Sequence, residues 1–571
     1  MSDYYESPFL PGYGHAYDAN KSNPIYREIQ ATQGSSLRLS RTFEGFVDYK
    51  FSINKNHNFG VTAGFSNEFT MTRSTSAYAS INDRGANAEN PLPRFDNDLR
   101  PNIWGASLVL GSGGYSDIAF QSIFARLNYD YDSKYLFMAS LRRDGSSKFA
   151  PGNRYGVFPA ISAAWRVTQE SFMENQNFFD ELKFRLSYGV SGNDQIGTYA
   201  WQGTAAYGSS QYIYGPGNVS ITEYPSGIEN RKLKWETNEQ YNVGFDIGIL
   251  NNRIQLVSDF FIRNTKDMIL ARPLPAENGF SASMLDNIGN MTNKGIELLL
   301  TTTNVKSNDF LWTTNWIFNK VWNKATKIYA PDGILRFSDG IFNSIYIVEG
   351  EEMFQFYAYK MLGVFKTEED LAKYPSAGLI IGDPIIEDLN RDGIINSDDF
   401  QNVGHALPKF TFGLSNTFNY KNFDLNIVID GSYGASLSNV VILNQNWVMP
   451  NQGNLMRYIY DRRGDVYGSP TIAVRGNRVG QHSYYFFDAS YARIKNVTLG
   501  YQIPSSICDK MNINALRLSF GIQNLYTFTN YPYYNPQANL NQGSAGTAQF
   551  GVDHGTYPLA TTYTLGINLT F

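Results

Sequence analysis

The sequence predicts an all-β protein, an antiparallel meander whose strands form a transmembrane β-barrel. Three observations predict this fold: a composition rich in strand and turn formers, about fifteen segments in which apolar and polar residues alternate, and connections that are alternately short and long. The chain of 571 residues is long enough for several ordinary domains or for one large barrel.

The composition favours strands and excludes several functions. Aromatic residues make up 15% of the chain and charged residues 17%, with 50 glycines, 39 tyrosines and 39 phenylalanines. Such a mixture is rich in residues preferred in strands and turns. A net charge of -5 without any basic run argues against a nucleic-acid binder. The single cysteine, Cys508, excludes an intrachain disulfide framework and a zinc site built on several cysteines.

Alternating segments recur along the whole chain, each bounded by turn-forming residues. Residues 43–51 and 59–65 form the first pair and predict a hairpin. The clearest later segments cover residues 125–131, 135–141, 157–165, 182–190, 243–249, 254–262, 295–303, 312–318, 410–418, 425–429, 497–503 and 516–522. The last segment, 563–571, ends the chain on an aromatic residue, with Tyr563, Leu565, Ile567, Leu569 and Phe571 on one face.

The connections between these segments alternate in length. Short links lie near 53–57, 132–134, 167–181, 251–252, 304–309, 421–423 and 504–514, and long ones span 70–120, 144–154, 191–241, 264–292, 322–408, 435–487 and 527–560. Outer-membrane barrels have short periplasmic turns at one rim and long extracellular loops at the other, whereas a soluble β-sandwich has no reason to sort its loops. We therefore expect the last strand to end at the periplasmic rim.

The expected organisation is an N-terminal extracellular-loop segment over residues 1–42 and a barrel over residues 43–571. No apolar run approaches the roughly 18 residues of a spanning helix, which does not exclude a barrel because barrel strands alternate. Residues 1–7 lack the features of a signal peptide, so we expect either that the protein is not exported or that its true N-terminus is missing.

Several long stretches resemble the SusC/RagA class of TonB-dependent outer-membrane transporters. They include SLRRDGSSKF at 140–149, NRYGVFP at 153–159, SYGVSGNDQIG at 187–197, LKWET at 233–237 and DASYARIKNVTLGY at 488–501. Residues 274–280, 287–290, 293–297 and 516–525 continue the similarity, which covers nearly the whole chain.

The resemblance implies a barrel of about 22 strands, an N-terminal plug and a TonB box. Compared with that family, we expect this chain to form a partial barrel of about fifteen strands, without the plug, the TonB box and about seven opening strands. The closing strand should consequently have an unpaired outer edge, or pair wrongly with the segment near Phe43.

The resemblance also implies a function and partners. It implies TonB-dependent uptake of oligosaccharides or peptides across the outer membrane of a Bacteroidota-type bacterium, with a SusD-like surface lipoprotein as partner and TonB acting only through the missing plug region. An alternative from another class is a calcium-binding, glycan-recognising surface or adhesin β-protein without transport, and an outer-membrane enzyme is a third.

The sharpest local motif, DLNRDGIINSDD at 388–399, lies in the expected 322–408 loop. It predicts a structural Ca²⁺ site because oxygen ligands at positions 1, 3, 5, 7, 9 and 12 can wrap a hard cation, with Gly393 making the sharp turn. The expected ligands are Asp388, Asn390, Asp392, the Ile394 carbonyl, Asn396 and Asp399. Asp399 stands where a longer Glu is usual. The alternative is an acidic loop rich in Asx turns that holds no metal.

The long connections are rich in aromatic and amide residues. These are Tyr199, Trp201, Tyr207, Tyr212, Tyr214, Asn444, Gln445, Asn446, Trp447, Tyr531, Tyr533, Tyr534, Asn535 and Gln537. Aromatic faces stack on sugar rings and amides bind hydroxyl or peptide groups, so they are candidates for ligand contact. Loop packing and a lipid-interface girdle are the alternatives.

No catalytic arrangement is recognisable in the sequence. The five histidines are scattered and accompany no H-E-x-x-H, G-x-S-x-G or P-loop pattern. We therefore expect a protein that is not an enzyme.

Overall fold

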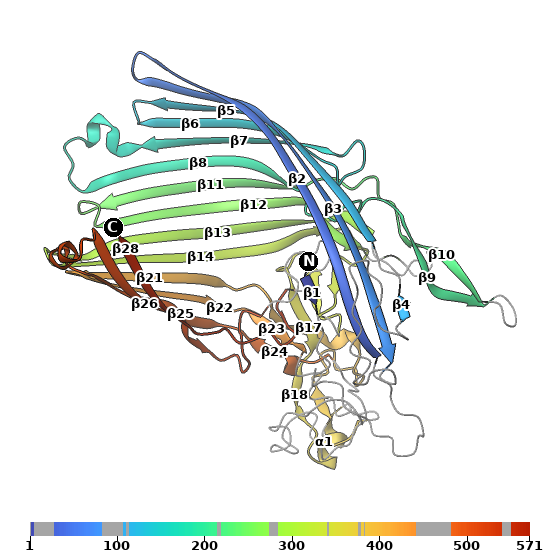
Figure 1. Cartoon of the computed structure of the whole chain (residues 1–571). Coiled ribbons are helices and arrows are strands. Elements are labelled where there is room, and N and C mark those ends of the chain that lie inside the picture. The colour runs from blue at the N-terminus through green and yellow to red at the C-terminus, as the bar shows by residue number, and fades with distance from the viewer. Residues whose placement is uncertain are drawn as a thin grey trace, which may run out of the picture.

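The main element of the protein is a large antiparallel sheet that forms a curved wall (Figure 1). The structure, a computed structural model, describes residues 2–4, 28–82, 107–109, 113–213, 219–272, 274, 284–339, 342–374, 379–381, 383–440, 481–538 and 550–571. Seventeen strands belong to the sheet, and fifteen of them form a meander, which confirms the predicted fold class. The short strand β1 (Ser2–Tyr4) pairs with the long strand that begins at Glu28. The short strand β4 (Ser107–Val109) pairs with the long strand that begins at His57.

Each strand of the meander pairs with the next one in the chain. They are β2 (Glu28–Ile53), β3 (His57–Asn82), β5 (Gly113–Tyr131), β6 (Tyr135–Ser146), β7 (Tyr155–Arg166), β8 (Phe179–Asn193), β11 (Glu236–Ile249), β12 (Ile254–Arg272), β13 (Met284–Lys306), β14 (Phe310–Ile328), β21 (Phe410–Tyr420), β22 (Phe423–Tyr433), β25 (Tyr491–Gln502), β26 (Ala515–Thr529) and β28 (Thr562–Thr570). A separate ribbon, β9 (Thr204–Ile213) and β10 (Val219–Gly227), extends from the connection between β8 and β11.

The connections alternate between two rims of the sheet, and most follow the predicted alternation of short and long, but the predicted short link between β7 and β8 (residues 167–178) is longer than the predicted long link between β6 and β7 (residues 147–154). The short turns gather at one rim, on the left in Figure 1, and the long connections leave the opposite rim. Several tight turns use left-handed backbone at Asn or Asp, as at Asn54 (φ 52°) and Asp132 (φ 51°). Such residues tolerate this conformation and allow the three-residue turns that join Ile53 to His57 and Tyr131 to Tyr135.

The strands run further toward the long connections than the sequence indicated. β2 begins at Glu28, so residues 28–42, which we expected to be loop, are largely strand, and β14 continues past residue 322 to Ile328. The reason is that residues 28–42 are mostly polar and alternate only briefly, at Ile29 and Ala31 and at Leu37 and Leu39, while their backbone still pairs with β3 from Glu28 to Thr42. Side-chain polarity reveals where a strand faces lipid, not where its hydrogen bonds end.

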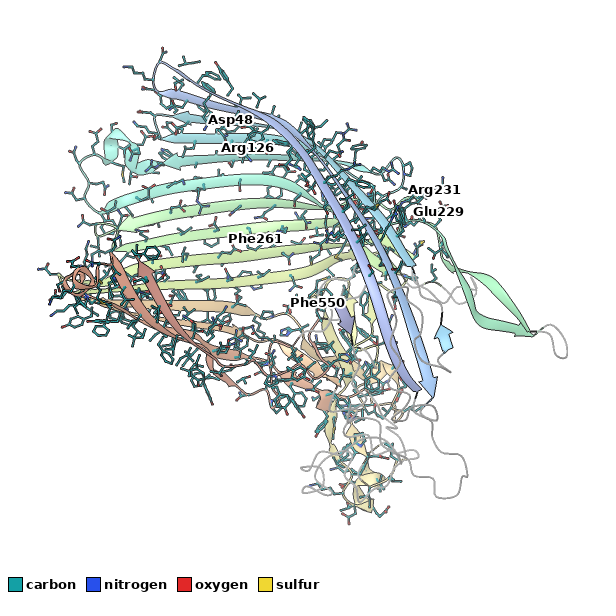
Figure 2. All side chains as sticks on the ribbon, viewed as in Figure 1. Asp48, Arg126, Glu229, Arg231, Phe261 and Phe550 are labelled. Atoms are coloured by element: carbon teal, nitrogen blue, oxygen red, sulfur yellow. The ribbon has the colours of Figure 1, made fainter. Side chains whose placement is uncertain are left out.

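The two faces of the wall differ in chemistry. One face carries apolar residues such as Val47, Phe137 and Ile161, and the other carries polar residues such as Asp48 and Arg126, which are labelled in Figure 2. Aromatic side chains pair across strands near the short-turn rim, for example Phe51 with Phe59 at 5.0 Å and Trp312 with Phe418 at 5.4 Å between ring centroids. This distribution matches a lipid-facing surface with an aromatic girdle. Among the described residues, none of the helices is both long and apolar enough to cross a bilayer.

The two ends of the meander are not joined to one another within the part of the chain that the structure describes. There, β28 pairs with β26 alone, and β2 pairs with β3 and the short β1. From the sequence we expected the closing strand either to have an unpaired outer edge or to pair wrongly with the segment near Phe43. The described residues show the unpaired edge and no pairing with the segment near Phe43.

Candidate functional site: the loop body at the long-loop rim

Three long connections pack into one unit at the long-loop rim, which we call the loop body. It comprises the described residues of 329–409, 434–490 and 530–561. Its strands form three small sheets: β15 (Ile334–Phe337), β16 (Ile345–Val348), β17 (Gln355–Tyr359) and β20 (Phe400–His405); β18 (Met361–Val364) with β19 (Pro384–Ile386); and β23 (Ser436–Asn439) with β24 (Phe486–Asp488) and β27 (Val552–Asp553). The last sheet takes strands from two connections and so ties them together.

Two hydrophobic clusters hold the loop body together and fix it to the wall. In one, Ile345 and Phe356 of the first connection pack with Val440 of the second and Val552 of the third. In the other, Leu335, Ile347 and Met353 pack against Met268, Ile288 and Ala325 of β12, β13 and β14. Burial of these side chains makes the loop body part of the folded wall, not a set of separate loops.

A buried carboxylate joins the first and second connections. Asp339 Oδ2 accepts hydrogen bonds from the hydroxyls of Ser344 at 2.7 Å and Ser438 at 3.0 Å, and its Oδ1 accepts from the Phe342 backbone N–H at 2.8 Å. His554 of the third connection contacts the Asp339 carbonyl oxygen through Nε2 at 2.9 Å. Because a buried charge is costly unless hydrogen-bonded, this arrangement favours one packing of the three connections.

A second buried cluster centres on Tyr531. Its hydroxyl donates to Asp553 Oδ2 at 2.6 Å and accepts from Asn439 Nδ2 at 2.8 Å. Burial, followed by the hydrogen bond to Asp553, raises the pKa of Tyr531 far above its ordinary value. Close by in the loop body, His482 is fully buried, and burial lowers its pKa to about 3. Both side chains are therefore neutral at physiological pH.

Arg493 fastens the third connection to the polar face of the wall. Its guanidinium donates to Asp430 Oδ1 at 3.1 Å and Oδ2 at 2.8 Å, and to Gln537 Oε1 at 2.8 Å. Gln537 also contacts the Tyr491 hydroxyl. Such a bidentate ion pair fixes the orientation of the guanidinium as well as its distance from the carboxylate. Residues 535–538 are therefore held against β22 and β25.

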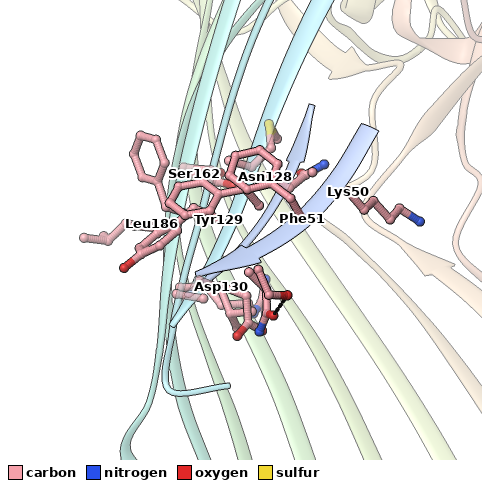
Figure 3. Close-up of a pocket in the computed structure, with 18 residues that line it drawn as sticks. Lys50, Phe51, Asn128, Tyr129, Asp130, Ser162 and Leu186 are labelled. Atoms are coloured by element: carbon pink, nitrogen blue, oxygen red, sulfur yellow. Dashed lines mark hydrogen bonds between the residues drawn. The ribbon is translucent and has the colours of Figure 1, made fainter. Parts of the chain in front are cut away.

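The polar face of the wall carries a second set of charges. Arg185 donates to Asp259 at 2.9 and 3.0 Å and to Asp246 at 3.0 Å, and Lys183 lies 3.5 Å from Asp246. A trough of about 880 Å³ crosses the wall beside this network, and Figure 3 shows Lys50, Asn128 and Asp130 among its lining residues. The sequence analysis missed the trough, because its lining comes from β2, β3 and β5–β8, which only strand pairing brings together.

The predicted calcium motif forms a compact loop in the loop body. Asp388 accepts from the backbone N–H groups of Asp392 at 3.2 Å and Gly393 at 2.9 Å, and Asn390 Nδ2 donates to Asp392 at 3.0 Å, so these three side chains lie together. Gly393 has φ +80°, which a side chain would oppose.

The remaining expected ligands of the calcium motif are arranged differently. Asn396 and Asp399 cap the short helix Ser397–Asp399, and the buried Asp399 carboxylate accepts from Leu389 and Asn396 N–H groups at 2.8 and 3.0 Å. The Ile394 side chain is 62% exposed. Within the described residues no group of three His, Cys, Asp or Glu side chains is arranged to hold a metal. The turn of a calcium loop is thus present, but its third carboxylate is engaged with backbone, and the site stays a prediction.

Most of the described loop aromatics pack inside the protein. Trp201 packs against the cluster of Phe149 and Leu233, and Tyr531 and Tyr533 belong to clusters of the loop body. Tyr199 contacts Asp117, and Tyr534 is 74% exposed. Asn535 is buried. The residues Tyr214, Asn444, Gln445, Asn446 and Trp447, and the side chains of Tyr207 and Tyr212, lie outside the described residues. Of the candidate aromatic residues whose side chains the structure describes, Tyr534 is thus the most exposed.

Five of the segments that carried the family resemblance meet at the long-loop ends of β6–β8, β11 and β13; they are 140–149, 153–159, 187–197, 233–237 and 287–290. Ser146 and Lys148 bind Asp194 at 2.8 and 3.6 Å, and Trp235 Nε1 donates to the Arg154 carbonyl at 2.9 Å. Asn287 Nδ2 donates to the Lys234 carbonyl at 3.0 Å. Beside them, Glu229 and Arg231 form an exposed ion pair (Figure 2). These motifs therefore join neighbouring connections to the wall.

A wall with one apolar face, a polar opposite face, short turns at one rim and packed loops at the other defines an outer-membrane β-barrel. The chain belongs to the TonB-dependent receptors: the family model described as TonB dependent receptor-like, beta-barrel matches residues 3–525. This result confirms the predicted outer-membrane localisation.

Individual relatives agree with this family. TonB-dependent receptor P3 of Formosa agariphila is 32% identical over 546 residues, covering 92% of this chain and 52% of that protein. TonB-dependent receptor SusC of Bacteroides thetaiotaomicron is 28% identical over 472 residues, covering 79% of this chain and 43% of that protein. The predicted resemblance to the SusC/RagA class is thereby confirmed. The chain spans about half the length of the curated relatives that it matches.

A solved structure shows the same fold. The structure of the RagAB peptide transporter matches with a TM-score of 0.76 and 23% identity, covering 95% of this chain and 56% of that chain. The curated relatives are named as receptors, which at the level of the family supports the expectation that the protein is not an enzyme.

Proposed function

We propose that the complete protein imports oligosaccharides or peptides across the outer membrane, driven by TonB and assisted by a SusD-like surface lipoprotein. The observation that carries the proposal is the wall itself, which offers lipid an apolar face and a solute a polar, charged face. The loop body at the long-loop rim supplies the surface that a substrate and a lipoprotein would meet first. The name of the RagAB peptide transporter suggests the peptide class, and the oligosaccharide class is what the resemblance to SusC/RagA transporters implies.

An uptake assay tests this proposal. Cells that lack the gene, and cells complemented with the complete gene, are supplied with fluorescent oligosaccharides and fluorescent peptides. Import that requires both the complete gene and TonB supports the proposal, and the class imported identifies the substrate. Surface binding that is independent of TonB, without import of either class, would favour the adhesin alternative. Copurification of a lipoprotein from host membranes tests the partner separately.

A further inference from the structure

The connection between β7 and β8, residues 167–178, has no part in the proposed transport. It contains two short 3-10 helices, Val167–Gln169 and Ser171–Met173, and lies at the short-turn rim (Figure 1). Phe172 is 67% exposed and Phe178 is 62% exposed. Phe178 contacts the ring of Phe179 edge-on at 4.7 Å between centroids but keeps most of its surface exposed. Two exposed phenylalanines at one rim indicate a surface that something apolar covers.

Phe178 is held outward by a fixed turn. Gln176 Oε1 accepts hydrogen bonds from the backbone N–H groups of Phe178 at 2.8 Å and Phe179 at 2.7 Å, while its Nε2 donates to the Phe179 carbonyl at 2.8 Å. A polar side chain thus supplies the internal contacts of the turn. The exposure of Phe178 is therefore built into the local structure.

Glu170 ties this connection to the apolar face of the wall. Its carboxylate accepts from the Tyr135 hydroxyl at 2.6 Å and from Trp165 Nε1 at 2.9 Å. Tyr135 and Trp165 are register partners on β6 and β7 and lie on the same face as Phe137 and Ala163. The connection consequently folds toward the lipid side of the rim, at the level of a Tyr and Trp pair typical of the membrane interface.

An apolar hollow lies on the same face, next to this pair. It measures about 280 Å³ and is lined by Tyr129, Phe137, Ala163, Trp165, Phe184 and Leu186, together with Tyr135. The small side chain of Ala163 lies among much larger neighbours. A hollow with almost no polar lining, open on the lipid side, suits a fatty acyl chain.

We propose that residues 167–178 and this hollow form a phospholipid anchor in the periplasmic leaflet of the outer membrane. An acyl chain occupies the hollow, and Phe172 and Phe178 lie at the boundary between headgroups and acyl chains. The argument for lipid over a protein partner is continuity, because Glu170 joins the connection to the face that the bilayer already covers. The anchor is independent of what the protein transports.

Accessibility of spin labels tests the position of the connection. The complete protein, with native cysteines replaced, is reconstituted in phosphatidylethanolamine and phosphatidylglycerol vesicles with Phe172→Cys or Phe178→Cys labelled. We expect access for oxygen and protection from a water-soluble nickel complex, with the exposed Asn175→Cys of the same connection as control. Equal nickel access at all three positions would overturn the anchor, as would protection seen in host membranes but absent in pure lipid.

Two further pairs of variants separate the anchor from general unfolding. Glu170→Ala should increase the access of the nickel complex to a spin label at Phe172→Cys. Glu170→Gln keeps an acceptor for Tyr135 and Trp165, so it should leave this access unchanged. Ala163→Phe fills the hollow and should reduce the phospholipid retained in native mass spectrometry, whereas Ala125→Phe, on the same face of β5, should not. Retention unaffected by Ala163→Phe would show that the hollow holds no lipid.

Discussion

Single buried polar side chains decide how the loops meet the wall. Asp339, Tyr531 and Arg493 each contact residues from two or more distant segments. The partners of these three side chains are close in space but far apart in the sequence. Removal of any of the three side chains leaves a buried donor or acceptor without its partner. At this scale the structure predicts where substitutions matter.

Arg493→Ala is expected to lower the free energy of unfolding by about 3 kcal/mol, because the loss of one partner leaves Asp430 partly buried without its counter-ion. Urea unfolding of the complete protein in vesicles measures the effect. Lys50→Ala is the matched control, since Lys50 and Asp48 are exposed at 80% and 40% and their pair should contribute little. Equal effects of the two variants would contradict the role of Arg493.

His482 should make the loop body sensitive to acid. Its pKa in the folded protein is lowered to about 3 by burial, below the ordinary value of 6.5. A depressed histidine pKa stabilises the fold above the unfolded pKa, and that stability is lost as pH falls from about 6.5 toward 3. Between pH 7 and pH 5 we expect a loss of about 2 kcal/mol.

Hydrogen exchange of the loop body at pH 7 and pH 5, corrected for intrinsic rates, measures this loss. The variant His482→Phe fills the same space without a titratable group and should remove that part of the pH dependence. An unchanged pH dependence in the variant would assign it to other groups.

At the scale of one element, the 388–399 loop provides the test of calcium. If it binds Ca²⁺, the ion should raise the melting temperature of the loop body, with a gain of about 2.7 kcal/mol at an ion concentration 100-fold above the dissociation constant. A chelator should reverse the gain. Asp392→Ala should abolish the calcium-dependent shift, while Asp398→Ala, outside the expected ligand set, should keep it. No shift in the unmodified protein would mean an acidic loop without metal.

The short turns and the connection 167–178 show that connections at the same rim can have different roles. The turn after β2 needs only left-handed residues such as Asn54, whereas 167–178 carries its own internal hydrogen bonds and an outward aromatic surface. The sequence placed both in the same class of short links. Tertiary contact with Tyr135 and Trp165 distinguishes them.

For the whole molecule, the outer edges of β2 and β28 determine behaviour in lipid. Among the described residues these edges are largely unpaired, and unpaired backbone groups are costly in a bilayer. Expressed by itself, this chain should aggregate and fail to show the heat-modifiable gel migration of a closed barrel. A chain extended to the length of its relatives should show it. Heat-modifiable migration of the 571-residue chain alone would prove this expectation wrong.

Much of the wall could be predicted from the sequence, and little of the loop body could. Alternation identified strands wherever one face meets lipid, as in 43–51, because the side-chain period of a strand is two residues. It failed at 28–42, where most residues are polar and apolar residues are too few to mark the strand, while backbone pairing continues through it. The calcium motif was visible because its ligands are close in sequence, whereas Asp339 and Ser438 gave no signal.

The sequence by itself determined the fold class, the order of strands, the alternation of loops and the resemblance to SusC/RagA transporters, because each depends on neighbouring residues or on motifs within one segment. Only the tertiary structure decided how the strand ends extend, how three connections join into the loop body, and how Glu170 turns residues 167–178 toward the lipid face. These features depend on contacts between residues far apart in the chain. Their energy comes from burial and hydrogen bonds that no single segment contains.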